Sequence, residues 1–183
     1  MLDSLRTRAG TRRKAGEIYG VVVTRARQPH FYAAMGVPDT PVGRYEMVTL
    51  HLFLVLERLR AAGDTSGLPR VLVETFVVDM DDCLRELGTG DLSVPKKVRR
   101  AAAGLYERTV ALRDALAASD DSALTGILTE HAYAGAAVHP GVEQLARYAR
   151  DASAALGQMA DVTDVAALSR AFPQLNDPAG EAA

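Results

Sequence analysis

Apolar residues recur at helical spacing along nearly the whole chain, and this pattern limits the fold more than any other feature. No segment shows the sustained alternation of apolar and polar residues that marks a half-buried strand. A chain of 183 residues is long enough for one domain with a sizeable core. The sequence therefore predicts an all-α fold, a single irregular or orthogonal bundle of about six to eight helices.

The expected helices follow from apolar stripes and from the residues that start and stop helices. Thr40 followed by Pro41 predicts an N-cap with proline in the first turn. Apolar residues lie nearly all round the helix that Pro41 opens, which predicts the central buried helix of the bundle. A short helix is opened by Pro29 and ended by Gly36. The other expected helices cover residues 13–27, 68–87, 94–118, 121–134, 140–158 and 162–171, and the one that Pro41 opens covers 41–61.

The helix at 68–87 is the most ambiguous of these predictions. The stretch VLVETFVV favours a strand by its β-branched content. However, Leu68, Leu72, Phe76 and Met80 recur at the spacing of a helix face. We therefore predict a helix.

The distribution of charged residues and of helix-breaking Pro and Gly predicts three regions in the chain. Residues 1–11 form a flexible basic N-terminus, residues 12–172 the all-α domain, and residues 173–183 a flexible tail. The net charge of −2 gives no reason to expect a specific nucleic-acid partner. Basic residues nevertheless predominate over residues 1–27, so contact of this arm with phosphates or lipid head groups stays open beside simple solvation.

Cellular location is indicated by one cysteine and by the length of the apolar runs. Cys83 is the single cysteine, so no internal disulfide can form, and a reducing compartment is expected. The most apolar run, residues 47–56, is about half the length of a bilayer span. We therefore expect a cytoplasmic protein and leave open peripheral contact with the cytoplasmic face of the bacterial inner membrane.

The stretch ARQPHFYAAMGVPDTPVGRYEM, residues 26–47, is stiffer and more apolar than a plain connector. Its prolines fix backbone dihedrals and so lower the cost of holding side chains in place. One interpretation is an apolar ledge that binds a peptide or helix. The other is a loop packed on the core. The ledge would consist of Phe31, Tyr32, Met35 and Val37, with Arg44 and Glu46 as charged neighbours, and with Tyr32 and Val37 more exposed than the other two.

An acidic run and a basic run flank the loop near Asp91. Folding the two expected helices as a hairpin sets Glu86 opposite Lys96 and Asp82 opposite Arg100. Cations in the first turn interact unfavourably with the helix dipole, at a cost of about 0.3–1 kcal/mol each. Neighbouring negative charges are therefore expected to offset this cost. Either this hairpin neutralises the KKVRR run or an acidic partner does. In the second case Lys96, Lys97, Arg99 and Arg100 would contact a client.

Catalytic and metal-binding motifs are weak. Asp79 and Asp82 share a helix face, as in helical enzymes that hold magnesium for isoprenoid diphosphates, but no second Asp-rich helix is visible. A lone DxxD pattern is common, so we expect no metal and no cofactor. His51 lies on the helix expected to be buried and is interpreted as a hydrogen-bonded core histidine rather than a ligand. No P-loop, GxSxG, HExxH or CxxC pattern is present, and we expect no catalytic residue.

Two ordered blocks of residues resemble the ubiquinol–cytochrome c chaperone family over about residues 12–160. The first block comprises Tyr19-Gly20, Arg25, Arg27-Gln28-Pro29, Phe31-Tyr32, Gly36-Val37-Pro38-Asp39-Thr40, Gly43-Arg44-Tyr45-Glu46-Met47 and Leu50-His51. The second comprises Asp79-Met80-Asp81, Leu84-Arg85-Glu86, Gly88, Gly90-Asp91-Leu92 and Val94-Pro95-Lys96-Lys97-Val98. The chain is similar to the shorter alphaproteobacterial members.

The resemblance implies an all-α chaperone for assembly of the cytochrome bc1 complex. It implies cytochrome b, nascent or newly inserted, as the client. In mitochondrial members it also implies a small partner chaperone and the ribosome. A client of transmembrane helices would then meet the apolar ledge, with Arg44, Glu46 and the KKVRR run supplying polar contacts. The alternative function is a helical metal-dependent enzyme that acts on an isoprenoid or lipid through Asp79 and Asp82.

Overall fold

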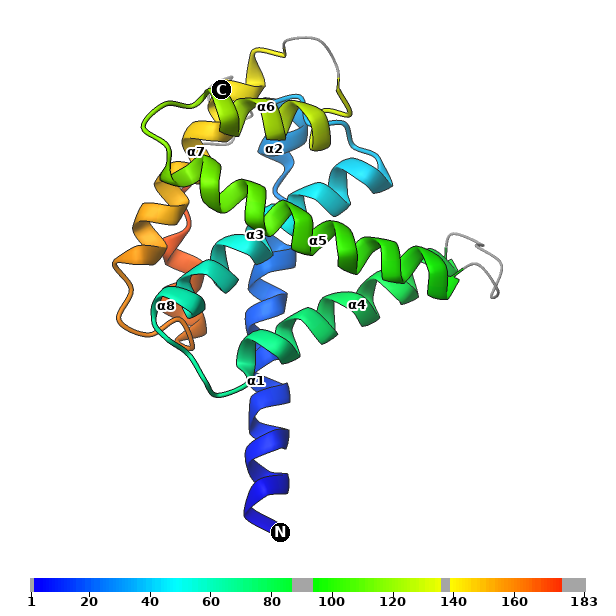
Figure 1. The fold of residues 1–183 in the computed structure, drawn as a ribbon, viewed down its shortest axis with the longest axis vertical. Coiled ribbons are helices and arrows are strands. Elements are labelled where there is room, and N and C mark those ends of the chain that lie inside the picture. The colour runs from blue at the N-terminus through cyan, green and yellow to red at the C-terminus, as the bar shows by residue number, and fades with distance from the viewer. Residues whose placement is uncertain (1, 87–93, 136–138, 176–183) are drawn as a thin grey trace, which may run out of the picture.

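The computed structural model describes residues 2–86, 94–135 and 139–175, and within these the side chains of residues 8–80, 103–135 and 139–175. Over the described residues the chain is helical, without strands, which confirms the predicted all-α bundle (Figure 1). The helices are α1 (Leu2–Ala26), α2 (Pro29–Ala33), α3 (Pro41–Ala61), α4 (Leu68–Glu86), α5 (Val94–Ala117), α6 (Ser122–His131), α7 (Gly141–Gly157) and α8 (Val165–Ala171).

Helix α3 is the centre of the bundle. It packs against α1, α4, α5 and α7, and every residue from Met47 to Val55 is buried, as expected for a central helix. Its start is also as predicted, because the Thr40 side chain accepts a hydrogen bond from the Gly43 N–H at 3.1 Å. The buried apolar residues of α3 are Met47, Val48, Leu50, Leu52, Phe53, Leu54, Val55 and Leu59.

Helix α6 packs against α5 and α7, and α8 packs against α1 and α7. The ambiguous segment is helix α4, and its predicted stripe of Leu68, Leu72 and Phe76 is buried. Burial of that stripe outweighs the β-propensity of the segment, since most helical stability in proteins comes from packing of an apolar face. Helix α4 lies against α1 and α5.

The N-terminal helix is longer than the sequence predicts. Helix α1 begins at Leu2 instead of near residue 13, so residues 2–11, which we assigned to the basic N-terminus, are helical. In Figure 1 this part of α1 projects beyond the other helices. The predicted flexible tail, residues 173–183, extends past the described residues and stays a prediction.

His51 lies in the core, as predicted, within a cluster of aromatic rings. Its Nδ1 lies 2.7 Å from the Met47 carbonyl oxygen, which can only accept, so Nδ1 carries the ring proton. Nε2 then accepts a hydrogen bond from the Tyr148 hydroxyl at 2.8 Å. Complete burial lowers the pKa of His51 to about 4, so this ring is neutral at physiological pH. The rings of Phe31 and Phe172 pack against it at centroid distances of 5.3 and 5.5 Å.

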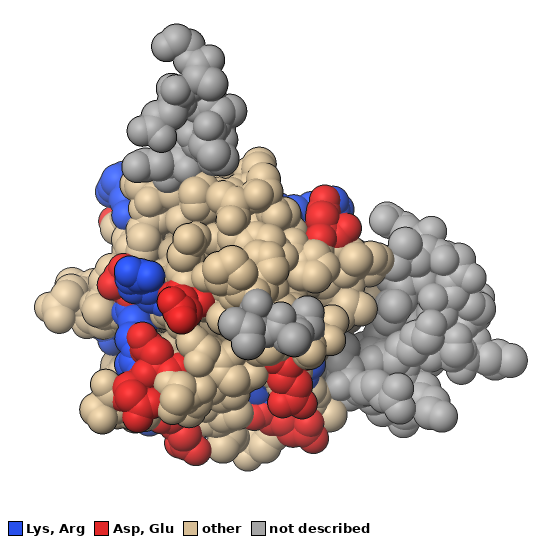
Figure 2. Space-filling model, turned by 90° about the horizontal axis from the view of Figure 1, so that it is seen from above, with Lys and Arg blue, Asp and Glu red and all other residues tan. Residues whose placement is uncertain are grey.

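Figure 2 shows charged side chains of both signs on one end of the molecule. On the end of the molecule shown in Figure 2, acidic and basic side chains lie next to one another, and uncharged residues occupy much of the described face. This face therefore gives no single-sign field of the kind that attracts nucleic acid. No helix among the described residues has the length and apolarity needed to cross a bilayer.

Candidate functional site

The proline-rich segment between α2 and α3 is clamped to the rest of the bundle by its backbone. The Met35 carbonyl accepts a hydrogen bond from the Tyr133 hydroxyl at 2.8 Å. Gly141, at the start of α7, passes so close that an added Cβ would lie 1.8 Å from the same carbonyl oxygen. Gly36 follows in a left-handed conformation with a φ of 70°, where glycine carries no steric penalty. The segment is therefore held rigidly, as its prolines suggest.

Three of the four residues predicted to form an apolar ledge are buried. Phe31, Met35 and Val37 are at most 5% exposed, so the prediction of an exposed Val37 is wrong. Phe31 packs edge-on against His51 and Tyr148 instead of facing solvent. For Phe31 and Met35 the reason lies in long-range packing, because α7 contacts them through Tyr148 and Gly141. For these three residues the loop-on-core interpretation is correct.

Tyr32 is the ledge residue that remains partly exposed. It lines an open surface hollow of about 570 Å³ together with Arg27, Pro29, Ala33, Asp39 and Arg44. Its hydroxyl donates to the Ala26 carbonyl at the end of α1, at 2.8 Å, which fixes the ring. Burial of much of the ring raises the pKa of the Tyr32 phenol, so the side chain stays uncharged.

Arg44 closes one side of this hollow. Its guanidinium binds the Asp39 carboxylate through two hydrogen bonds, at 2.6 and 3.1 Å, and both side chains are exposed. The pair is planar and two-pronged, which orders Arg44 more than a single contact would. The hollow thus combines an aromatic side wall with a charged rim. It could accept a polypeptide segment that carries both apolar and polar groups.

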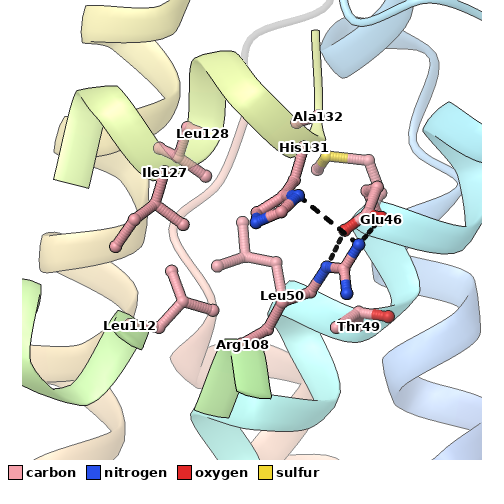
Figure 3. A pocket seen from close by; sticks show the side chains of 10 residues that line it. Glu46, Thr49, Leu50, Arg108, Leu112, Ile127, Leu128, His131 and Ala132 are labelled. Carbon is pink, nitrogen blue, oxygen red and sulfur yellow. Dashed lines mark hydrogen bonds and ion pairs between the residues drawn. The ribbon is translucent and has the colours of Figure 1, made fainter. Parts of the chain in front are cut away.

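Glu46 is not at the surface, which corrects the prediction that it forms part of a charged rim. It is 7% exposed and forms a two-pronged ion pair with Arg108 of α5, at 2.7 and 2.6 Å. In Figure 3 the Arg108 guanidinium lies against the Glu46 carboxylate, with the ring of His131 beside the pair. The Nδ1 atom of His131 lies 3.4 Å from Arg108 Nη2. Arg108 was missed because it lies 62 residues from Glu46, and no local pattern marks such a pair.

A cavity beside this ion pair is too small for an organic ligand. Its volume is about 20 Å³, which corresponds to a single water at most. Leu50 and Leu112 line it opposite Glu46 and Arg108 (Figure 3). The cluster therefore joins α3, α5 and α6 and is not a binding pocket for substrate.

The predicted basic contacts on α5 lie outside the described side chains. Lys96, Lys97, Arg99 and Arg100 belong to the first turns of α5, whose backbone is described. Their pairing with Glu86 and Asp82 and their role in client binding stay predictions.

A hydrogen bond counts against the interpretation of Asp79 and Asp82 as a metal site. The Asp79 carboxylate accepts from the Tyr19 hydroxyl at 2.9 Å, which ties it to α1, while the side chain of Asp82 lies outside the described residues. Among the described side chains, no three His, Cys, Asp or Glu residues gather in a group that could hold a metal ion.

Comparison with known proteins gives two matches. The family described as ubiquinol-cytochrome C chaperone matches residues 33–167. The crystal structure of the Cbp3 homolog from Brucella abortus matches with a TM-score of 0.78 and 35% sequence identity, over 91% of this chain and 93% of that chain. No curated protein sequence matches.

Proposed function

Because the chain belongs to the ubiquinol-cytochrome c chaperone family, we propose that it is a non-enzymatic chaperone that binds cytochrome b during assembly of the bc1 complex. The observation that carries the proposal is the family match over residues 33–167, supported by the likeness to the Cbp3 homolog across nearly the whole of both chains. The client is nascent or newly inserted cytochrome b, held until its cofactors and partner subunits arrive.

The hollow around Tyr32 is the proposed contact for this client. A segment of a membrane protein carries apolar side chains together with polar ends. The half-buried Tyr32 ring offers apolar area, and Arg27 and Arg44 offer charges beside it. Aromatic residues and arginine are the side chains that most often dominate binding energy at protein interfaces. The rigid segment beneath the hollow lowers the ordering cost of binding.

The proposal is tested in two steps in a bacterial strain from which the gene is deleted. The strain should lose haem b absorbance and quinol–cytochrome c reductase activity in its membranes, and the wild-type gene should restore both. Normal bc1 content in the deletion strain would overturn the proposed function. A photoreactive amino acid at position 32 should then crosslink to cytochrome b during its synthesis.

A matched control separates the contact site from the function. Arg44 and Arg70 are both exposed arginines in two-residue ion pairs, with Asp39 and Glu74 respectively. Arg44→Ala together with Tyr32→Ser should lower bc1 assembly, whereas Arg70→Ala should not. If both variants assemble bc1 normally, the client binds elsewhere and the chaperone function itself stands.

The projecting part of α1 is the proposed contact for the ribosome. The N-terminal part of α1 projects beyond the other helices (Figure 1). Arg8, Arg12 and Arg13 are exposed on α1, and RNA phosphates attract such groups in a salt-dependent way. Changing all three to Ala should remove low-salt association with ribosomes and leave the melting temperature unchanged. Undiminished co-sedimentation of the triple variant would exclude this contact.

A further inference from the structure

The outer face of α5 carries apolar side chains that no described element covers. Tyr106 is 73% exposed and Val110 is 40% exposed, although both are large. Ala103 and Ala117 are also exposed. In Figure 1, α5 crosses in front of α1 and α3, so its inner face meets the body of the protein. The inner face is occupied by Leu105 and Leu112, which are buried in the core.

These exposed residues form one stripe along the helix. Ala103, Tyr106, Val110 and Ala117 follow one another at intervals of three, four and seven residues, which keeps them on a single face. This is the spacing with which one helix packs against another at a shallow angle. Single exposed apolar residues are ordinary, but a stripe of four at this spacing is the pattern of a helix-packing surface.

The charges of α5 are sorted between its two faces. Over residues 103–117 both arginines turn toward α3, where Arg108 binds Glu46 and Arg113 binds Glu57 at 2.9 Å. The two acidic residues, Glu107 and Asp114, are exposed. They are seven residues apart, two helical turns, so they lie on the same flank of the apolar stripe. Arg113 is 36% exposed but paired with Glu57, so the exposed carboxylates of Glu107 and Asp114 place negative charge on one side of the stripe.

We infer that the outer face of α5, Ala103 to Ala117, is a docking surface for an amphipathic helix of a partner protein with a basic flank. The apolar stripe would pack against the apolar face of that helix, with Tyr106 as the main anchor. Glu107 and Asp114 would face its Lys or Arg residues and fix its orientation, since charge complementarity sets partner choice and register at such interfaces. This surface lies on α5, separate from the hollow around Tyr32, and does not depend on the client proposed above.

The surface can be probed with two designed peptides. Both are 21-residue helices with Leu at the stripe positions, one with Lys and one with Glu on the flanks, used at concentrations where each is monomeric. Fluorescence anisotropy with the full-length protein should show the Lys peptide binding at least tenfold more tightly than the Glu peptide. The difference should shrink as salt is raised, because exposed charges are screened. Equal binding of the two peptides, or no binding of either, would overturn the inference.

Variants of the protein complete the test. The charge-reversal variant, Glu107→Lys with Asp114→Lys, should bind the Glu peptide more tightly than the Lys peptide. The stripe variant, Tyr106→Ser with Val110→Ser, should bind both peptides at least tenfold more weakly and keep its melting temperature. The control Arg70→Glu with Glu74→Lys changes a comparable exposed pair on α4 and should alter neither affinity. A preference that survives the charge reversal would place the peptide elsewhere. Sedimentation of the protein alone tests whether a second copy occupies the surface. If the wild type is a dimer and the variant Tyr106→Ser with Val110→Ser is a monomer, the occupant is a second copy and the proposed partner is overturned.

Discussion

Arg108 of α5 and Glu46 of α3 form a two-pronged ion pair that is almost entirely removed from solvent. The side chains are 18% and 6% exposed, and the guanidinium also lies 5.7 Å from the centroid of the Tyr45 ring. A carboxylate in such a place must be neutralised, because an unpaired buried charge is costly. The pair therefore fixes how α5 crosses α3, and with it the position of the outer face of α5.

Breaking this pair from one side should destabilise the fold strongly. Arg108→Met leaves Glu46 buried without its partner and should cost about 3 kcal/mol in the free energy of unfolding. The double variant Glu46→Gln with Arg108→Met removes the charge and should recover part of that loss. Chemical denaturation measures both. Arg44→Met, which breaks an exposed two-pronged pair, should cost less than about 1 kcal/mol and serves as the control. Equal costs for the two arginines would contradict the burial of the Arg108 pair.

His51 should make stability depend on pH between about 4 and 6.5. Its pKa is lowered to about 4 in the folded protein and is about 6.5 when unfolded, so in this window only the unfolded chain takes up the proton. Stability is complete above pH 6.5 and falls as the pH drops toward 4, by about 3 kcal/mol in all. Denaturation curves of the wild type and His51→Gln at pH 7 and pH 5 isolate this contribution, because the other histidines remain in both. Parallel pH profiles for the two proteins would contradict it.

Substitution of two glycines that lie against another backbone segment should destabilise the fold. An added Cβ at Gly141 would lie 1.8 Å from the Met35 carbonyl oxygen, and one at Gly43 would lie 2.0 Å from that of Pro38. Gly141→Ala and Gly43→Ala should each cost about 1–3 kcal/mol, since the backbone on the other side must move. Gly20→Ala, at an open position in α1, should instead stabilise by about 0.5–1 kcal/mol. A thermal melt of Gly141→Ala that matches the wild type would show that α7 can move away from the proline segment.

Features that depend on residues close together in the sequence were predicted correctly, and features that depend on contacts between distant residues were not. Local signals sufficed for the helices other than the N-terminal part of α1, for the Thr40 cap and for the buried centre of α3, because periodicity and caps depend on residues a few positions apart. His51 was placed correctly for the same reason, since it sits on a helix that is apolar all round. Glu46 was misplaced because its partner, Arg108, lies far along the chain in α5. Val37 was misplaced because its burial, at 2% exposed, has no signal in the residues around it. The charge or hydrophobicity of a side chain alone did not reveal whether it would lie in the core or at the surface.

The hairpin pairing of Asp82 and Glu86 with Arg100 and Lys96 remains a prediction that mutations can test. Reversing Lys96 and Arg100 to Glu should lower the melting temperature modestly, because exposed pairs contribute about 0.2–1 kcal/mol each. Changing Asp82 and Glu86 to Lys in that variant should restore the melting temperature. Purely additive effects in the four-protein cycle would show that the two runs do not face each other. In that case an acidic partner becomes the better explanation of the KKVRR run.

Phe31 and Tyr32 are neighbours in the sequence and should respond to truncation in opposite ways. Phe31 is fully buried against His51 and Tyr148, so Phe31→Ala should cost about 3–5 kcal/mol and lower the amount of folded protein. Tyr32→Phe loses one hydrogen bond, to the Ala26 carbonyl, and should cost about 1 kcal/mol. Tyr32→Ser should in addition remove the aromatic wall of the hollow and lower bc1 assembly while the protein still folds. Denaturation curves and haem b spectra of the three variants separate stability from function. A Tyr32→Ser protein that folds and fully restores bc1 content would exclude the hollow as the client contact, because no other residue lining it is aromatic.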